Sequence, residues 1–252
     1  MRIKSIVKLY ERNAVSVSGL VGSGKDMLSA NVIERRNIPH VSNCPYNKLT
    51  IPYDYNALRC GDNTYKEFVE NNLKRYEFPY FDGCDIYLSD CGIYFPSQFC
   101  NELNRDYKQL PTFMALSRQL GKCHVHFNAQ NLNRVWDKIR EMSDVYIRCK
   151  KCFVLFGGRI VIQTITIYDK YQSCADRVKP CAIRVPLLCS REKRLQIQMH
   201  RDTFKNTYGD IKNHILIYRN KSEYDTRFFK KLLKGGKAIE KTNEGNDKKK
   251  DN

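Results

Sequence analysis

The sequence predicts an α/β fold in which a mainly parallel β-sheet is flanked by helices and is followed by a β-hairpin-rich C-terminal extension. Two observations carry this prediction. Over residues 1–150, strand patterns alternate with segments of helical periodicity, which is typical of a parallel sheet covered on both faces. After residue 150 the pattern becomes that of a hairpin, which indicates antiparallel strands.

The first part of the chain contains three strand patterns and two helix patterns. Residues 14–18 (AVSVS) carry β-branched residues before a glycine-rich turn, so we expect a strand there and a helix over residues 25–36. A second strand is expected at residues 38–43. Residues 64–76 carry apolar side chains at helical spacing, and residues 85–89 (DIYLS) are typical of a short buried strand.

The alternation continues through the middle of the chain. We expect helices at residues 97–108 and 111–120, the second because proline is favoured at the first helical position. Residues 123–129 (CHVHFNA) alternate in polarity and predict a strand. A helix at residues 135–142 and a strand at residues 145–149 complete the parallel part.

The C-terminal part is expected to be rich in strands. Residues 153–168 contain two adjacent glycines between apolar runs, which predicts a hairpin. Residues 183–189 and 195–199 are expected to add short strands, and residues 224–233 have the pattern of a basic amphipathic helix.

The composition divides the chain into three parts. We expect a core at residues 1–150 that carries the nucleotide-binding motifs. Residues 151–234 would form a β-rich extension, with its basic helix, packed on that core. Residues 235–252 are dominated by Lys, Asn, Asp, Glu and Gly, which predicts a disordered charged tail.

The chain is strongly basic. Its 44 Lys and Arg against 27 Asp and Glu give a net charge of +17, which suggests a polyanionic partner or surface lysines that only solvate the protein. Residues 134–151 and 221–237 interleave positive charge with aromatic side chains. Such a surface suits a DNA backbone and its bases, an anionic lipid surface, or a solvated helix face.

The cysteines and the apolar runs bear on the compartment. With eleven cysteines and no secretory pattern at the N-terminus, we expect a reducing cytosol in which most thiols are small core hydrophobes. No run of 18 apolar residues occurs, so we expect no transmembrane segment. Cys149 and Cys152 have the spacing of metal ligands. Separate core thiols are the favoured alternative to a zinc site, and His124 and His126 are expected to pack rather than ligate.

A phosphate-binding loop is the strongest motif. Residues 19–25 match G-x4-G-K between a strand pattern and a helix pattern. Glycines let several backbone N–H groups converge on a phosphate, the helix N-terminus adds positive potential, and Lys25 adds a full charge. The motif predicts a P-loop NTPase that binds ATP with Mg²⁺. The expected nucleotide-binding residues are Gly19, Gly22, Ser23, Gly24, Lys25, Asp26 and Met27.

Two acidic residues are the expected metal ligands. Asp26 stands where the hydroxyl of Ser or Thr normally ligates Mg²⁺. A carboxylate is also a hard oxygen ligand, although it brings negative charge close to the phosphates unless the metal lies between them. Asp90 follows the strand at residues 85–89, where a Walker B aspartate would serve the metal. A helix or turn cap is the alternative for Asp90.

Three residues are the expected catalytic group: Asp90, Gln130 and Arg118. Gln130 follows a strand end, where it can sense the γ-phosphate, and Arg118 could act in cis or on a neighbouring subunit's nucleotide. Cys91 stands where ATPases of this general plan usually have a glutamate base. Because a thiol is a poor general base toward water, Cys91 argues against efficient hydrolysis.

These motifs, in their order and spacing, resemble the N-terminal ATPase domain of the zonular occludens toxin (Zot) family. That family includes the assembly ATPases of filamentous phages and is related to FtsK/HerA-type DNA-translocating ATPases. The resemblance spans roughly residues 12–233. It rests on residues 19–25, 88–98 (LSDCGIYFPSQ), 116–130 (LSRQLGKCHVHFNAQ), 135–141 (VWDKIRE) and 224–233 (YDTRFFKKLL).

The resemblance implies a RecA/FtsK-HerA-like fold and ATP-driven assembly, export or packaging of single-stranded phage DNA. It also implies a homo-oligomer in the host bacterial cytoplasm, peripheral at the inner membrane, with a phage coat or inner-membrane assembly protein as partner. By motif position, Lys25 would hold phosphates, Asp90 would serve Mg²⁺ and Gln130 would sense nucleotide. The chain departs from the family at Asp26 and Cys91 and in lacking the usual transmembrane segment.

Two other functions fit the same motifs. A nucleotide kinase could use Arg134, Arg140 and Arg148 as a phosphate clamp, and it would transfer phosphate to a nucleoside monophosphate. A nucleotide-gated docking module would bind ATP with little turnover. Asp26 and Cys91 favour the module, which predicts affinity for ATP without DNA-stimulated hydrolysis.

Overall fold

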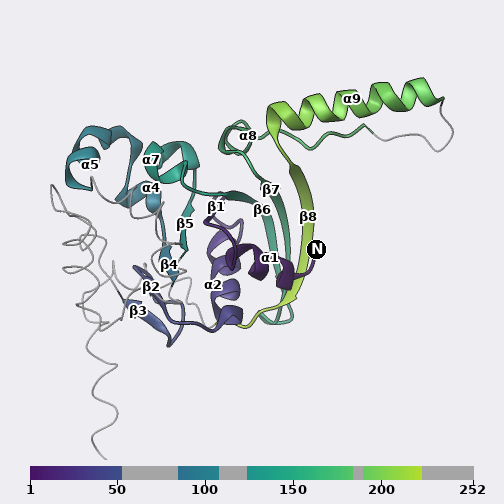
Figure 1. Ribbon diagram of the computed structural model, residues 1–252. Helices are drawn as coiled ribbons and strands as arrows, with labels where there is room; N and C mark the ends of the chain where they lie inside the picture. Colours follow the sequence, from purple (N-terminus) through teal and green to yellow (C-terminus); the bar gives the residue numbers. More distant parts are fainter. Residues whose placement is uncertain (53–84, 108–123, 184–189, 223–252) are drawn as a thin grey trace, which may run out of the picture.

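The computed structural model describes residues 1–52, 85–107, 124–183 and 190–222, and their strands form one sheet (Figure 1). The strands are β1 (Val15–Ser18), β2 (His40–Ser42), β3 (Thr50–Pro52), β4 (Asp85–Leu88), β5 (Val125–Ala129), β6 (Val145–Leu155), β7 (Ile160–Tyr168) and β8 (Ile211–Arg219). Their order in the sheet is β3-β2-β4-β5-β1-β6-β7-β8.

The sheet is mainly parallel. Neighbouring strands from β3 to β6 in that order pair in parallel, whereas β6–β7 and β7–β8 are antiparallel. The predicted fold class is therefore confirmed, with a hairpin extending the parallel part. β5 lies between β1, which leads into the glycine-rich loop, and β4, which leads to Asp90.

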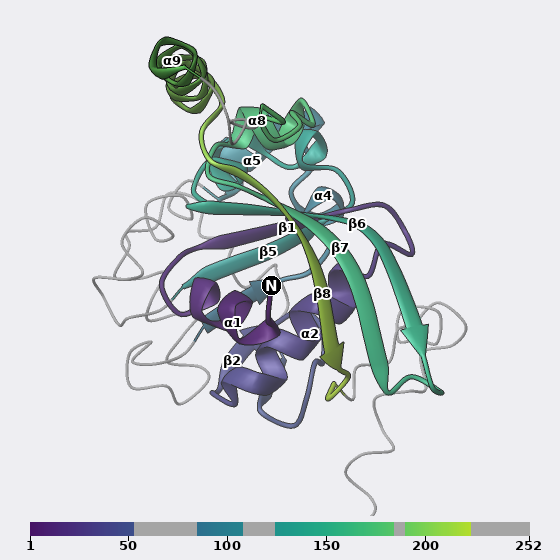
Figure 2. The same ribbon diagram turned by 90° about the vertical axis from the view of Figure 1, so that its right-hand side faces the viewer.

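Helices cover both faces of the sheet (Figure 2). The helices are α1 (Ile3–Tyr10), α2 (Lys25–Arg36), α4 (Cys91–Tyr94), α5 (Cys100–Asp106), α7 (Asp137–Arg140), α8 (Tyr171–Ala175) and α9 (Arg191–Tyr208), with 3₁₀ turns η3 (Ser97–Phe99) and η4 (Leu132–Arg134). In Figure 2, α1 and α2 lie on one side of the sheet, and α4, α5 and α8 lie on the other.

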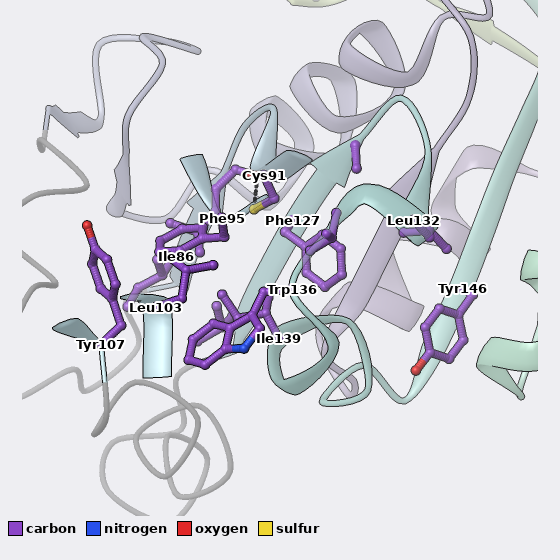
Figure 3. Packing of buried hydrophobic residues seen from close by; sticks show 14 of the residues in the cluster. Ile86, Cys91, Phe95, Leu103, Tyr107, Phe127, Leu132, Trp136, Ile139 and Tyr146 are labelled. Carbon is purple, nitrogen blue, oxygen red and sulfur yellow. Dashed lines mark hydrogen bonds between the residues drawn. The ribbon is translucent and has the colours of Figure 1, made fainter. Parts of the chain in front are cut away.

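Side chains alternate between two hydrophobic clusters, because successive residues of a strand point to opposite faces. On β4, Ile86 and Leu88 join the cluster with α4, α5 and α7, whereas Tyr87 joins the cluster with α1 and α2. Figure 3 shows the first cluster, in which Trp136 and Phe127 are fully buried side chains. All four residues of β4 are buried, as expected for a strand that is covered on both faces.

Most predicted elements in the described ranges are confirmed, with shifted ends. The helix predicted at residues 25–36 is α2, which has these bounds. The expected helix at 97–108 is a 3₁₀ turn followed by α5, and the one at 135–142 is only the short α7. The predicted elements at 64–76, 111–120 and 224–233, residues 184–189 of the strand predicted at 183–189, and the tail at 235–252 lie outside the described residues.

The strand predicted at residues 195–199 is wrong, because this segment lies inside α9. Leu195, Ile197 and Met199 alternate with glutamines and imitate a strand. The residues at both ends of the segment favour a helix. The Ser190 hydroxyl accepts a hydrogen bond from the backbone N–H of Lys193, and Gly209 follows the last helical residue with a φ of 74°. No side chain of α9 is buried, and the helix stands out from the sheet in Figure 1.

The hairpin is longer than expected and continues the main sheet. β6 runs through residue 150, and β7 pairs with it from Ile160 to Tyr168. The pairing shifts by one residue between Cys149 and Lys151, as in a β-bulge. β8, which was not predicted, then adds to β7. The division into core, extension and tail stays a prediction.

A buried ion pair ties α2 to β4. Asp85 begins β4 and forms an ion pair with Arg36, the last residue of α2. The backbone N–H of His124 donates to Asp85 Oδ1 at 3.1 Å. Burial alone would raise the pKa of Asp85, but hydrogen bonding to His126 and the charge of Arg36 outweigh it, and the pKa is lowered. Asp85 is therefore a buried carboxylate that depends on these partners.

His126 links the same network to β1. Its Nδ1 accepts a hydrogen bond from the backbone N–H of Val15 at 3.2 Å, so the proton of the neutral ring sits on Nε2, 3.6 Å from Asp85 Oδ2. Burial lowers the pKa of His126, which keeps the ring neutral. Both predicted packing histidines thus lie beside Asp85, and His126 packs on Tyr10 and Tyr87.

We expect Arg36→Met to lower the free energy of unfolding by about 3 kcal/mol, because it leaves the Asp85 carboxylate buried without its cation. Urea denaturation at pH 7 measures the change. Arg35→Met is the matched control on the same helix, since the described contacts of Arg35, with Asn31, the carbonyl of Arg219 and the ring of Tyr218, include no buried carboxylate. Equal losses in the two variants would contradict the role given to the ion pair.

Candidate phosphate-binding site

The site lies where the carboxyl ends of β1, β4 and β5 meet at one edge of the sheet. In open α/β sheets this edge is where ligands bind. The glycine-rich loop, residues 19–24, follows β1, Asp90 follows β4, and Gln130 follows β5. The parallel pairing of these strands therefore brings together residues that lie far apart in the sequence.

The loop depends on glycine at three positions. Gly22 and Gly24 have φ angles of 81° and 79°, in the left-handed region that favours glycine. A Cβ on Gly19 would lie 2.3 Å from Ser23 Oγ and 2.8 Å from the carbonyl oxygen of Cys149. The loop can close over β6 only because Gly19 has no side chain.

The start of α2 is open to an anion. Gly24 is the N-cap of α2 and has no side chain to accept from the first backbone N–H groups of the helix, which a helix leaves without internal partners. These groups and the helix dipole favour negative charge at this end. Leu20 and Val21 are 70% and 83% exposed, so the outer part of the loop faces solvent.

Ser23 adds an unexpected feature. Its side chain is buried, and its hydroxyl oxygen has no hydrogen-bond partner among the described residues. Buried polar groups of this kind are uncommon. Together with the open helix end and the glycines, this hydroxyl fits a loop built to surround a phosphate.

Lys25 is buried and doubly paired. Its Nζ donates to Asp26 Oδ1 at 2.8 Å, to Asp26 Oδ2 at 2.7 Å and to Asp90 Oδ1 at 3.3 Å. Burial alone would lower the pKa of Lys25, but the two carboxylates outweigh it and leave the pKa raised. Lys25 is therefore a fully charged ammonium at neutral pH.

Asp26 and Asp90 converge on this one ammonium from different elements. Asp26 lies in the first turn of α2 and also accepts from Asn128 Nδ2 at 3.3 Å. Asp90 has a φ of 51° and occupies the N-cap position of α4, but its side chain makes no capping hydrogen bond there. Two hard oxygen donors around one cation fit a divalent metal as well as an ammonium.

A polar chain behind the carboxylates was not anticipated. The Ser29 hydroxyl donates to Asn128 Oδ1 at 3.0 Å, and Asn128 Nδ2 lies 3.3 Å from the Tyr46 hydroxyl. Tyr46 in turn bonds the Ser89 hydroxyl. The signal in the sequence was Asn128, an amide near the end of a buried strand, where function rather than packing selects a polar side chain.

Cys91 does not face the site. It begins α4, it is fully buried in the cluster of Figure 3, and its thiol donates to the carbonyl of Leu88 at 3.6 Å. Burial, and then the charge of Asp90, raise its pKa well above the ordinary value. The residue that follows Asp90 is therefore a core residue in this structure. Its identity does not indicate which group would activate water.

Gln130 lies on another side of the loop. It is exposed and lines a small pocket with Gly19, Leu20, Arg148 and Arg177. Sequence reasoning considered Arg148 only as part of a kinase clamp and missed Arg177. The two guanidinium groups add positive charge next to the start of the loop.

Some of the predicted site residues lie together in the structure, and others do not. The structure brings Lys25, Asp26 and Asp90 together and places Gln130 at the neighbouring pocket. Met27 is half-buried and packs against the cluster of α1 and α2. Arg118 lies outside the described residues. The chemical roles given to these residues stay predictions.

The cysteines show no metal cluster in the ranges described. Cys149 and Cys174 are buried in the two clusters on opposite faces of the sheet, as separate core thiols would be. Among the described residues, no three His, Cys, Asp or Glu side chains are grouped so that they could hold a metal ion. In the same ranges, no helix combines the length and apolar character that a bilayer span needs.

Comparison with known proteins yields structural likenesses only. No protein-family model and no curated protein matches the sequence. The N-terminal domain of zonular occludens toxin from Neisseria meningitidis is 11% identical, with a TM-score of 0.42, covering 86% of this chain and 96% of that one. The genome packaging NTPase B204 from Sulfolobus turreted icosahedral virus 2, in complex with AMPPCP, is 10% identical, with a TM-score of 0.40, covering 67% and 95%.

The ATPase DotB from Legionella pneumophila is 12% identical, with a TM-score of 0.33, covering 94% of this chain and 67% of that one. At these identities and TM-scores the likenesses are too weak to assign a function.

Replacing Gly24 with alanine should destabilise the protein more than replacing Gly22. Both glycines have left-handed φ angles, which cost an L-residue about 1–2 kcal/mol. A Cβ on Gly22 would meet nothing within 4 Å, but a Cβ on Gly24 would lie 2.6 Å from Cys152 Sγ. Denaturant unfolding of Gly22→Ala and Gly24→Ala measures the difference. If the two lose equal stability, the loop does not pack against β6 as described.

Proposed function

We propose that this protein is a P-loop ATPase that binds ATP with Mg²⁺ at residues 19–26 and uses its hydrolysis to assemble, export or package single-stranded phage DNA. One observation carries the nucleotide-binding part: a buried, charged lysine lies between two carboxylates at the open N-terminus of α2, under a glycine loop. The finer function rests on the Zot-like sequence motifs and on the basic surface.

The loop and Lys25 would bind the phosphates. Backbone N–H groups of the loop and of the first turn of α2 would donate to phosphate oxygens, and Lys25 would add its charge. Asp26 and Asp90 would hold the metal, directly or through its waters. Bound Mg²⁺ neutralises phosphate charge and stabilises the charge that develops in phosphoryl transfer.

Binding would require Lys25 to exchange partners. In the structure its ammonium is held by Asp26 and Asp90. A phosphate that binds Lys25 competes with these carboxylates and is repelled by them, because all three groups are negative. Asp26 therefore competes with the phosphate for Lys25, unless a cation binds the two carboxylates.

A basic surface supports the nucleic-acid part of the proposal. α9 has no buried side chain, most of its residues are exposed, and it carries more basic than acidic side chains. Its basic residues other than histidine are Arg191, Lys193, Arg194, Arg201 and Lys205, against Glu192 and Asp202. A surface of this kind can follow a phosphate backbone. A homo-oligomer in the host bacterial cytoplasm, peripheral at the inner membrane beside a phage coat or assembly protein, completes the proposal.

The second candidate is a nucleotide-binding docking module with little hydrolysis. The pairing of Lys25 with Asp26 favours it, because this pairing weakens the hold on phosphate. The kinase alternative has less support: Arg140 stacks on Tyr171, with 4.7 Å from the guanidinium carbon to the ring centroid, and does not point to the loop as a clamp would.

ATP hydrolysis by the purified protein, with and without single-stranded DNA, tests the proposal. We expect turnover that DNA stimulates, and a loss of at least about a hundredfold in Lys25→Ala, which removes the charge on the phosphates. Circular dichroism would check that the variant is folded. ATP binding without turnover in either condition would favour the docking module, and phosphate transfer to a nucleoside monophosphate would favour the kinase.

Asp26→Ser should reduce the dependence of nucleotide binding on metal. In wild type we expect a fluorescent ATP analogue to bind at least about tenfold more weakly in EDTA than in Mg²⁺, because Asp26 then repels the phosphates unopposed. The serine variant should lose most of this difference. Asp137→Ser, on the exposed first turn of α7, changes net charge equally and should behave as wild type. The same metal dependence in all three proteins would refute the competitor role of Asp26.

A further inference from the structure

Gln163 of β7 reaches the phosphate-binding loop from the antiparallel part of the sheet. Its side chain is fully buried. Its Nε2 lies 3.0 Å from the carbonyl oxygen of Ser23 and 3.0 Å from that of Gly24. Its Oε1 accepts a hydrogen bond from the Tyr218 hydroxyl of β8 at 3.1 Å. The three contacts use both ends of the amide.

This network fixes the orientation of the amide. An amide nitrogen carries two hydrogens and an amide oxygen carries none. Only the nitrogen can therefore face two carbonyl oxygens, while the oxygen faces the hydroxyl of Tyr218. Gln163 is a double donor to consecutive peptide groups of the loop and could not be replaced by an acceptor such as glutamate without repulsion.

The contact also controls where the loop's N–H groups point. In a trans peptide the C=O of one residue and the N–H of the next point in opposite directions. The Gly24 carbonyl is shared between Gln163 and the backbone N–H of Leu28, whereas the Ser23 carbonyl is held by Gln163. With both carbonyls held on this side, the N–H groups of Gly24 and Lys25 point away from β7. These are the groups that a phosphate at the start of α2 would meet.

The surrounding contacts hold the loop against the same strands. Cys152 of β6 pairs with Gln163 across the hairpin, and a Cβ on Gly24 would lie 2.6 Å from Cys152 Sγ. Beyond β8, Asn220 Oδ1 accepts from Asn31 Nδ2 of α2 at 2.8 Å. The antiparallel strands and the residue after β8 thus contact α2 at its N-cap, Gly24, and again at Asn31.

We propose that Gln163, held by Tyr218, is a positioning residue for phosphate binding: it orients the loop's N–H groups without touching the nucleotide. This inference rests on the proposed function, since it concerns the same loop. It adds that the antiparallel strands β7 and β8 help to form the nucleotide site.

The test compares two buried polar residues of β7. Gln163→Leu removes the donor to the loop. Thr166→Val is the matched control, because Thr166 is also buried and its hydroxyl donates to Asn213 Oδ1 of β8 at 2.6 Å, whereas among the described contacts it makes no hydrogen bond to the loop. Equilibrium binding of ATP·Mg²⁺ and, by competition, of tripolyphosphate would be measured for each variant, together with its thermal unfolding.

We expect Gln163→Leu to weaken both ATP and tripolyphosphate by about tenfold, the effect of losing two hydrogen bonds that orient the loop. Thr166→Val should lower the unfolding temperature but change neither affinity by more than about twofold. Equal affinities in the two variants would overturn the proposal. Failure of wild type to bind either probe would instead refute the proposed function, and this inference with it.

Tyr218→Phe provides a second route that keeps Gln163 in place. It should weaken binding in the same direction but by less, because Gln163 loses only its anchor. The double variant Gln163→Leu, Tyr218→Phe should bind no more weakly than Gln163→Leu alone, since both changes act through one network. Additive losses would count against the proposal, and no loss in Tyr218→Phe would do so even if Gln163→Leu did not fold.

Discussion

The ion pairs of Lys25 with Asp26 and Asp90 are the interaction on which the candidate site depends. A buried ammonium is costly unless it is paired, and here two carboxylates hold it at hydrogen-bonding distance. Under the proposed function, the same arrangement supplies a cation for phosphate and two carboxylates for a metal. Lys25 would then have to leave a carboxylate before it could bind a phosphate.

The rest of the fold keeps these charges in place. Parallel pairing of β4, β5 and β1 brings Asp90 and Asn128 to the loop, and the ion pair of Arg36 with Asp85 ties the far end of α2 to the start of β4. From the other side, Gln163 holds the loop's carbonyls. Both ends of α2 are thus fixed to strands, so the position of Lys25 is set by the sheet and not only by the loop.

Local features of this structure were predictable from the sequence, whereas contacts between distant segments, apart from the meeting of Asp26 and Asp90, were not. The glycines, Lys25 and the helix that follows obey local rules of turn and capping chemistry, so α2 has its predicted bounds. The segment at 195–199 misled, because alternating apolar residues resemble a strand when the caps at Ser190 and Gly209 are overlooked. Gln163 had no local signal at all, since its role depends on a loop about 140 residues earlier in the chain. The sequence places Cys91 directly after Asp90, where a glutamate base is usual. Whether its side chain faces the site depends on how α4 packs, which the sequence does not indicate.

A crystal structure with a non-hydrolysable ATP analogue and Mg²⁺ would test the partner exchange most directly. We predict that the phosphates lie in the loop at residues 19–24, that Lys25 Nζ has left Asp26 for a phosphate oxygen, and that Asp26 and Asp90 face the metal. An analogue bound elsewhere, or a Lys25 that keeps both Asp26 contacts with nucleotide in the loop, would contradict the account.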